Sequence, residues 1–548
     1  MKHVRLFRLL LAATLPVVML LLLGLVERHA NARETLTTAP AGATPESRQP
    51  DWQGGGPLGR GRGDLAPTIG RTFYVDANYA GEQEGTPARP WRTVGQALKT
   101  AGNGDAILLA GGAYSENLVI SRSVQLAGGY APSSSPISWT RSISTFPTIV
   151  DGRQLGSVLT ISGYVNALVT GLTLTNGRAG LGGGIHVEHA WVTLNDDTII
   201  GNSATGAHGS GGGLYALASA LTISKTRFLE NTATDWGGGL YLMRSYATID
   251  QATFATNTVA GGGGGLFAEQ AVLDLAHSVV ISNTADCCGG GVGGQHSTLV
   301  LNHNQISYNR VDPASSFGGG IYARDGVVHI DANTVTYNRA FAGAGIVSGA
   351  GDSELVNNFI ARNDGGGILF QSGAIINNTL RHNGANDYGD HGEGILISAA
   401  ADPSIVNIIN NIVIGNAYGI TRAGSGVTIT LLRNDVWGNQ LADYAGVERG
   451  TTDMAADPLL AAEIQDGYRL LAGSPCIDTG VAASAPATDF DDEPRPLDGD
   501  IDGNAVVDIG ADEFKHPPTT PTATPTPLPE IPLRFPLFLR DHSWRMGG

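Results

Sequence analysis

Residues 237–257 read GGGLYLMRSYATIDQATFATN, and this layout of a glycine run, short apolar pieces and a closing asparagine recurs along the chain. The asparagine that ends each repeat follows a hydrophobic residue and two variable ones, at Asn176, Asn202, Asn231, Asn257, Asn283, Asn309, Asn338, Asn363, Asn383, Asn416 and Asn439. The first and last of these lie 263 residues apart in ten intervals, which gives a mean period of about 26 residues.

Within a repeat the apolar residues alternate with a period of two, as at Leu240 and Leu242, then Ile249, then Phe254. Three short strands joined by glycine and asparagine turns make one coil of a parallel β-helix. Coils stack about 4.8 Å apart, so ten intervals extend the rod by roughly 50 Å. A single coil cannot bury its apolar face alone, so neighbouring coils must stabilise one another.

The repeated asparagines and glycines have structural explanations. Asparagine tolerates left-handed backbone, and its side chain satisfies turn amides, so stacked asparagines can bond coil to coil. Glycine permits positive φ and close approach of coils. The glycine runs are not phosphate loops, because the GxxxxGK[ST] pattern is missing from the sequence.

Composition excludes several classes of protein. Hydrophobic residues make up 42% of the 548, which excludes wholesale disorder. A formal net charge of −17 argues against nucleic acid as a partner. Three cysteines (Cys287, Cys288 and Cys476) cannot build a disulfide framework or a four-cysteine zinc site.

Both ends of the chain differ in composition from the repeats. Residues 1–32 have the positive start, apolar run and small-residue cleavage site of a signal peptide, with an uncleaved membrane anchor as the alternative. Residues 33–70 read as a flexible linker. Residues 516–530 form a Thr/Pro spacer, and 531–548 contain a short apolar stretch. Spacer and tail are interpreted either as a surface attachment or as a ragged terminus.

The N-terminal end of a β-helix exposes sheet edges that need a cover. Residues 73–76 predict a short strand, and residues 91–101 predict a capping helix with Val94, Ala97, Leu98 and Ala101 on one face.

Two terminal stretches carry a family resemblance. Residues 74–120, YVDANYAGEQEGTPARPWRTVGQALKTAGNGDAILLAGGAYSENLVI, resemble the opening of right-handed parallel β-helix proteins of the pectin-lyase-like superfamily. The motifs from Asp457-Pro458 through GSPCIDTG (473–480) to VDIGADE (507–513) resemble the end of choice-of-anchor Q domain proteins. The resemblance implies a single-stranded right-handed parallel β-helix over residues 71–515, capped at both ends, in a secreted or bacterial cell-surface protein. It implies no particular activity.

One ladder of side chains follows the glycine runs, two residues after each. It contains His186, Tyr215, Tyr241, Phe267 and Tyr322. Alternation sends these side chains outward, which predicts an aromatic ribbon with rings about 4.8 Å apart. Charged residues lie just beyond it, among them Arg244, Glu269 and Arg324. Such a ribbon suits a glycan chain; the alternative is that stacked rings only strengthen the sheet.

Catalytic motifs such as GxSxG and HExxH are missing from the sequence. Asp196 and Asp197 faintly resemble the paired acids of polygalacturonase-type hydrolases. However, Asp197 precedes Asn202 by five residues, as Asn304 precedes Asn309, which assigns it to an ordinary turn. A lyase would use Arg244 or Arg324 as its base.

A candidate calcium loop lies near the C-terminus. Asp498, Asp500, Asp502 and Asn504 follow the start of an EF-hand-like pattern, and Asp508 offers a further carboxylate. A complete EF-hand is excluded because Ile509 stands at the twelfth position, where glutamate is required. The alternative is a solvated acidic turn.

Three functions remain open. The preferred hypothesis is a monomeric secreted or surface protein that binds extracellular polysaccharide or cell-wall glycan without catalysis, with Ca²⁺ as the one candidate cofactor. The others are a polysaccharide lyase or hydrolase, and an adhesin or structural spacer.

Overall fold

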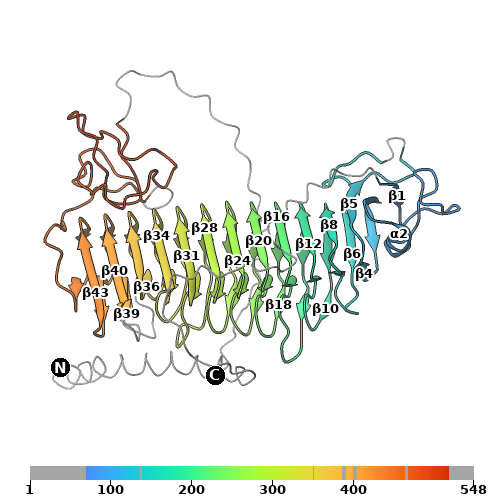
Figure 1. Cartoon of the computed structure of the whole chain (residues 1–548), viewed down its shortest axis with the longest axis horizontal. Coiled ribbons are helices and arrows are strands. Elements are labelled where there is room, and N and C mark those ends of the chain that lie inside the picture. The colour runs from blue at the N-terminus through green and yellow to red at the C-terminus, as the bar shows by residue number, and fades with distance from the viewer. Residues whose placement is uncertain are drawn as a thin grey trace, which may run out of the picture.

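The computed structural model describes residues 70–516, apart from 136–138, 350, 385–390, 399–403 and 463–466. It confirms the predicted all-β parallel solenoid (Figure 1). Its strands form three long sheets and one short sheet, and every pairing between these strands is parallel.

Sheet 1 has 14 strands, in the order β1 (Thr72–Val75), β2 (Asp105–Ala110), β5 (Val124–Tyr130), β8 (Asn166–Thr170), β12 (Trp191–Asn195), β16 (Ala220–Ser224), β20 (Tyr246–Asp250), β24 (Val272–Ala276), β28 (Thr298–Asn302), β31 (Gly326–Asp331), β34 (Gly351–Val356), β37 (Gly373–Ile376), β40 (Ser404–Ile409) and β43 (Val427–Leu432). Sheet 2 has 13, in the order β3 (Gly112–Tyr114), β6 (Thr148–Asp151), β9 (Leu172–Thr175), β13 (Thr198–Ile200), β17 (Arg227–Leu229), β21 (Thr253–Ala255), β25 (Val279–Ile281), β29 (Gln305–Ser307), β32 (Thr334–Thr336), β35 (Phe359–Ala361), β38 (Thr379–Arg381), β41 (Ile412–Ile414) and β44 (Asp435–Trp437).

Sheet 3 also has 13, in the order β4 (Leu118–Ile120), β7 (Leu159–Ser162), β11 (Ile185–Glu188), β15 (Leu214–Leu217), β19 (Leu240–Met243), β23 (Leu266–Glu269), β27 (Val292–Gln295), β30 (Ile321–Arg324), β33 (Ile346–Ser348), β36 (Ile368–Phe370), β39 (Glu393–Ser398), β42 (Tyr418–Ala423) and β45 (Ala442–Ala445). Sheet 4 has five short strands, in the order β10 (Arg178–Ala179), β14 (Ser203–Ala204), β18 (Thr232–Ala233), β22 (Thr258–Val259) and β26 (Thr284–Ala285).

The repeat of residues 237–257 corresponds to one coil. Its glycines lead into β19 of sheet 3, and the chain continues through β20 of sheet 1 and β21 of sheet 2. Leu240, Ile249 and Phe254, one from each strand, are fully buried in the central core. Leu240 pairs with Leu266 of the next coil and Phe254 with Val280, so the 26-residue period is kept in register.

The glycine runs are required by the approach of neighbouring coils. Gly237 has a φ of 62°, in the left-handed region. A Cβ at Gly239 would lie 2.4 Å from the Gly265 carbonyl oxygen of the next coil, closer than non-bonded atoms can approach. The first glycine therefore turns the chain, and the third permits stacking.

The predicted asparagine ladder is confirmed from Asn202 to Asn439. Asn176 does not belong to it: this residue is exposed, and Gly177 lies at the ladder position of its coil, where its N–H donates to Asn202 Oδ1 (2.8 Å). Asn283 is fully buried; its Nδ2 donates to the Asn309 Oδ1 of the next coil (2.9 Å), and its Oδ1 accepts from the Asn257 Nδ2 of the previous coil (2.9 Å). A second ladder lies at the corner between sheets 1 and 2, where Asn304 Nδ2 donates to Asn333 Oδ1 (3.0 Å).

The predicted N-terminal cover is also present. Strand β1 pairs with β2 and extends sheet 1 by one strand. Helix α2 (Val94–Thr100) buries Val94 and Ala97 against the end of the core, and the Glu116 carboxylate accepts the first N–H groups of the helix (2.8 Å from Val94). In the part of the chain that the structure describes, no helix is long and apolar enough to cross a membrane. The proposed signal peptide, linker, spacer and tail lie outside the described residues, apart from Gly70 of the linker and His516 of the spacer.

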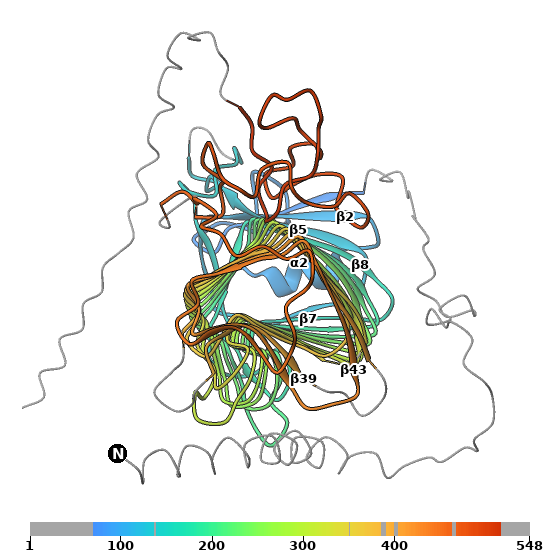
Figure 2. The same cartoon turned by 90° about the vertical axis from the view of Figure 1, so that its left-hand side faces the viewer.

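The described residues of 457–516 (all but 463–466), here called the flank segment, lie along the side of the last coils instead of continuing the rod (Figures 1 and 2). Their apolar side chains pack on the outer face of sheet 2, for example Ile509 and Leu470 against Ile412. The second asparagine ladder, at the corner between sheets 1 and 2, ends at Asp453, before the flank segment begins. The carboxylate of Asp453 accepts the Asn434 backbone N–H (3.0 Å).

Candidate functional site

The predicted aromatic ribbon points away from the central core but is not exposed. Tyr215, Tyr241 and Phe267 form a separate buried cluster with exposures of 5% or less, covered in part by Trp236 and Leu181. Tyr322 is buried in the next cluster along the rod, and only His186 is partly accessible. The expectation of an open stacking surface is therefore wrong, because the turns between sheets 2 and 3 fold over the outer face of sheet 3.

The charged residues beside this ladder are engaged with their own neighbours. Glu269 accepts a hydrogen bond from the Tyr241 hydroxyl. Arg244 Nε donates to Gln270 Oε1 (3.0 Å), and Arg324 pairs with the carboxylate of the adjacent Asp325 (3.1 Å). Burial, followed by the negative charge of Glu269, raises the pKa of Tyr241 above its ordinary value. In the described chain these groups bond to protein partners rather than converging on an open site.

An open groove of about 720 Å³ lies elsewhere, on the outer face of sheet 2 near the N-terminal end. Its floor is formed by strands β6, β9, β13 and β17, and residues 141–147 line one side of it. The corner between sheets 1 and 2 contributes Asp196 and Lys225, both held in left-handed backbone (φ 55° and 49°) that directs the chain into the next strand.

Three exposed cations face this groove: Arg141, Lys225 and Arg227. Arg141 is fixed by hydrogen bonds from Nε to the Gly128 carbonyl (3.0 Å) and from Nη2 to Thr170 Oγ1 (2.9 Å). Arg227 Nη2 donates to Thr198 Oγ1 (3.0 Å). Each guanidinium has five N–H donors, so both keep further donors for a ligand.

The two adjacent acids of the groove differ in role. Asp197 is 1% exposed, and its two oxygens accept the backbone N–H groups of Leu172 (2.8 Å) and Asn195 (3.1 Å). Burial raises the pKa of Asp197 to about 7, against the lowering effect of those two hydrogen bonds. The prediction that Asp197 occupies an ordinary turn position is confirmed. Asp196 is exposed and accepts from Asn195 Nδ2 (2.9 Å).

The candidate calcium residues are separated by the fold. Asp498 and Asp500 lie with Asp478, each offering a carboxylate oxygen within 4.8 Å of the others. Three carboxylates are the hard oxygen donors that Ca²⁺ prefers, so this trio fits the ion. Asp502 continues the turn by accepting the N–H of Asn504 (2.7 Å), and neither residue belongs to the trio.

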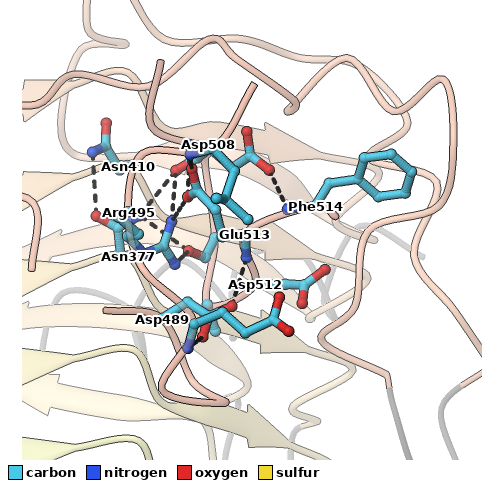
Figure 3. A network of polar contacts seen from close by, with 12 residues as sticks. Asn377, Asn410, Asp489, Arg495, Asp508, Asp512, Glu513 and Phe514 are labelled. Atoms are coloured by element: carbon cyan, nitrogen blue, oxygen red, sulfur yellow. Dashed lines mark hydrogen bonds and ion pairs between the residues drawn. The ribbon is translucent and has the colours of Figure 1, made fainter. Parts of the chain in front are cut away.

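Asp508 belongs to a buried network that fastens the flank segment (Figure 3). Its oxygens accept the N–H groups of Asp478 (2.7 Å) and Phe514 (2.6 Å), which removes it from the predicted metal set. In the same network Arg495 pairs with Glu513 at 2.6 Å, both side chains being almost fully buried. Burial raises the pKa of Asp508 to about 8, and the charge of Glu513 adds to this effect.

Sequence reasoning missed Arg141, Lys225, Arg227 and Asp478. For the groove, the sequence contained one indication, because Lys225 is one of only four lysines in the chain. Asp478 lies in the quoted GSPCIDTG motif but 20 residues before Asp498, so local spacing could not connect them. Arg141 comes from a loop that only the folded chain brings to sheet 2.

Comparison with known proteins supports the fold. The family model described as "Right handed beta helix region" matches residues 283–436, and the model described as "Protein of unknown function (DUF1565)" matches residues 78–309. Among curated proteins, none matches the chain significantly.

Three solved structures illustrate the similarity. The pectate lyase Pel9A is 16% identical, with a TM-score of 0.34 over 82% of this chain and 99% of that one. The periplasmic alginate epimerase AlgG is 10% identical (TM-score 0.36; 64% and 76% covered). PfbA, a surface adhesin of Streptococcus pneumoniae, is 11% identical (TM-score 0.34; 64% and 85% covered). The match to the right-handed β-helix model confirms the expected right-handed parallel β-helix, and residues 78–309 are similar to the DUF1565 model.

Proposed function

We propose that this protein is exported and binds an anionic extracellular polysaccharide, without turning it over, in the groove on sheet 2. The main support for the proposal is that Arg141, Lys225 and Arg227 all line one groove, although the net charge of the chain is −17. Guanidinium groups bind carboxylates through paired, charge-assisted hydrogen bonds, so a polymer of uronic acids is the favoured class.

The shape of the groove suits a polymer better than a small molecule. Its floor crosses four neighbouring strands of sheet 2, which corresponds to about 14 Å along the rod. The groove is open on its outer side, so a chain can lie in it without an end having to enter. Arg141 and Arg227 are already held by protein hydrogen bonds, which lowers the entropy lost when a ligand is bound.

The acids of the groove favour binding over hydrolysis. A glycoside hydrolase needs two carboxyl groups facing the scissile bond, roughly 5–10 Å apart. Both oxygens of Asp197 accept backbone N–H groups and the side chain is buried, so only Asp196 of this pair faces solvent.

Binding is tested by calorimetry with a polyuronate and with a neutral glucan of similar length. We expect the polyuronate to bind, with an affinity that falls as salt is added. Lys225→Ala and Arg227→Ala should each weaken binding about tenfold, because a hydrogen bond to a charged group contributes about 1.5 kcal/mol or more. Arg92→Ala is the matched control, since Arg92 is exposed on the N-terminal cover and should leave the affinity unchanged.

Equal binding of the neutral glucan, or equal loss in Arg92→Ala, would contradict the proposed site. Assays for unsaturated and reducing-end products test the claim that the polymer is not turned over. Product formed by the wild type and lost in Arg244→Ala or Arg324→Ala would favour the lyase alternative instead.

A further inference from the structure

A pair of adjacent cysteines lies in the turn between β26 and β27. Cys287 Sγ and Cys288 Sγ are 2.8 Å apart, so the two sulfurs already face each other. A disulfide bond is about 2.05 Å long, and closing it requires a movement of about 0.8 Å. Cys476 is buried in the flank segment, where its thiol donates to Asp435 (3.3 Å).

The backbone of the preceding coil holds this pair in place. Cys287 N–H donates to the Gly261 carbonyl (3.1 Å), and the Cys288 carbonyl accepts from Gly263 (2.9 Å). Gly262 makes room for the pair, because a Cβ there would lie 3.0 Å from Cys288 Sγ and 2.6 Å from the Trp236 ring.

The two thiols differ in access. Cys287 is partly exposed, whereas Cys288 is 5% exposed and packs in the apolar cluster that contains Phe317 and Tyr322. The hydrogen bond from Cys288 lowers the pKa of the Cys287 thiol, and the same contact raises the pKa of Cys288. An accessible thiol with a lowered pKa is the one that attacks an external disulfide.

We propose that Cys287 and Cys288 form a redox-active vicinal dithiol that closes to a disulfide by exchange with an external disulfide. The Cys287 thiolate attacks one sulfur of the donor, forming a mixed disulfide and releasing one donor thiol. The sulfur of Cys288 then attacks Cys287 Sγ, releases the second donor thiol and closes the ring. Two electrons and two protons pass from the protein to the donor, which is reduced to two thiols.

The closed form is expected to be reversible. Adjacent Cα atoms lie about 3.8 Å apart, below the usual 4.4–6.8 Å of disulfide-bonded residues, so the ring carries strain. Strained disulfides are reduced more readily than structural ones. The turn thus has two states, an open dithiol and a closed disulfide, and it lies beside the Trp236 ring. That ring covers part of the aromatic cluster of sheet 3.

The test titrates thiols in full-length protein incubated with oxidised glutathione and then denatured. Three thiols are expected in the reduced protein and one, that of Cys476, after oxidation, with an intact mass lower by two hydrogens. Cys288→Ser should instead retain glutathione on Cys287, because the resolving thiol is missing. Cys287→Ser should react little, because both remaining thiols, Cys288 and Cys476, are buried.

Circular dichroism of each variant confirms the fold, and Cys476→Ser should still lose two thiols on oxidation. Three titratable thiols in the wild type after prolonged oxidation would overturn the proposal. A wild type that keeps glutathione on Cys287 would overturn it too.

Discussion

A buried asparagine of the main ladder satisfies polar groups of both neighbouring coils with one side chain. Asn283 accepts from the backbone N–H and the Nδ2 of Asn257, and it donates to the Phe254 carbonyl and to Asn309. All of these groups are buried between coils, where an unsatisfied donor or acceptor costs about 1–3 kcal/mol. The repeated asparagine is therefore a stability device that the sequence alone could identify, since the period shows which residues stack.

Asn283→Ala should lower the free energy of unfolding by about 3 kcal/mol or more, because several buried partners lose their hydrogen bonds at once. Urea unfolding followed by circular dichroism measures the change. The matched control is Asn166→Ala, at an exposed position, with an expected change within about 0.5 kcal/mol. Equal effects of the two substitutions would contradict the role assigned to the ladder.

Asp197 occupies the corner position that Asn304 fills in a later coil, but it carries a titratable carboxyl. Its pKa is about 3.8 in the unfolded chain and about 7 when buried, so the folded state holds the proton more tightly. The associated stability is fully present below about pH 4 and is lost as the pH rises through 7. As the pH rises through this range, the free energy of unfolding falls by about 4 kcal/mol.

Asp197→Asn should remove this pH dependence, because the amide does not titrate and asparagine already fits the same position in later coils. We expect the variant to be more stable than the wild type at pH 8 and to differ much less at pH 4. Urea midpoints between pH 4 and 8.5 measure the effect. Parallel pH profiles for the two proteins would contradict the assignment.

At the scale of elements, the sequence predicted strands, coils and the N-terminal helix, because each follows from a local period. It also predicted correctly that Tyr215 and Tyr241 leave the central core, since alternation decides which face of a strand a residue occupies. It could not show that the turn carrying Trp236 folds over those rings. Such covering depends on contacts between turns and sheets, for which no local period exists.

The C-terminal motifs likewise depend on contacts with a distant part of the chain. Residues quoted for their family resemblance now have structural roles: Ser474 Oγ donates to the Pro458 carbonyl, and Ala511 N–H donates to Thr379 of sheet 2. Arg495 and Glu513 form the buried ion pair of this segment (Figure 3). The motifs identified a docked segment, but the surface on which it docks became visible only in the fold.

Arg495→Met should loosen the flank segment, because Glu513 would keep a buried charge without its partner, at a cost of about 3–5 kcal/mol. We expect limited proteolysis to cut within residues 457–516 much faster than in the wild type. Lys515→Ala removes an exposed ion pair to Glu493 and serves as the control, with little change expected. Equal protease resistance of Arg495→Met and the wild type would contradict the role of the buried pair.

Calcium, if it binds the Asp478, Asp498 and Asp500 trio, should stabilise the flank segment rather than perform chemistry. We expect the melting midpoint to be higher with calcium than with chelator in the wild type. The difference should vanish in Asp500→Ala and persist in Asp502→Ala, whose carboxylate lies outside the trio. Identical wild-type midpoints with calcium and chelator would favour a solvated acidic turn.

At the scale of the whole molecule, the 14 strands of sheet 1 correspond to a rod about 60 Å long. The two additions to the rod differ in kind: the N-terminal cover closes one end, whereas the flank segment covers a side (Figures 1 and 2). The proposed binding groove lies near the covered end, and the flank segment occupies sheet 2 farther along. An elongated body of this kind presents its sides, rather than an enclosed pocket, to a long ligand.

Deletion of residues 517–548 tests whether the proposed spacer and tail attach the protein to a surface. The flank segment's described contacts end just before this point, with Phe514 N–H on Asp508 and Lys515 beside Glu493. An equal melting midpoint for the truncated protein and the full chain is the control that the described fold is retained. If the tail attaches the protein, fractionation of producing cells should find the full chain on the cells and the truncated chain in the medium.

A scrambled tail of equal composition is the control. If attachment is specific, the scrambled tail should also release the protein, whereas non-specific adhesion of apolar residues would keep it on the cells. Identical distribution of full and truncated chains would show that the tail does not attach the protein.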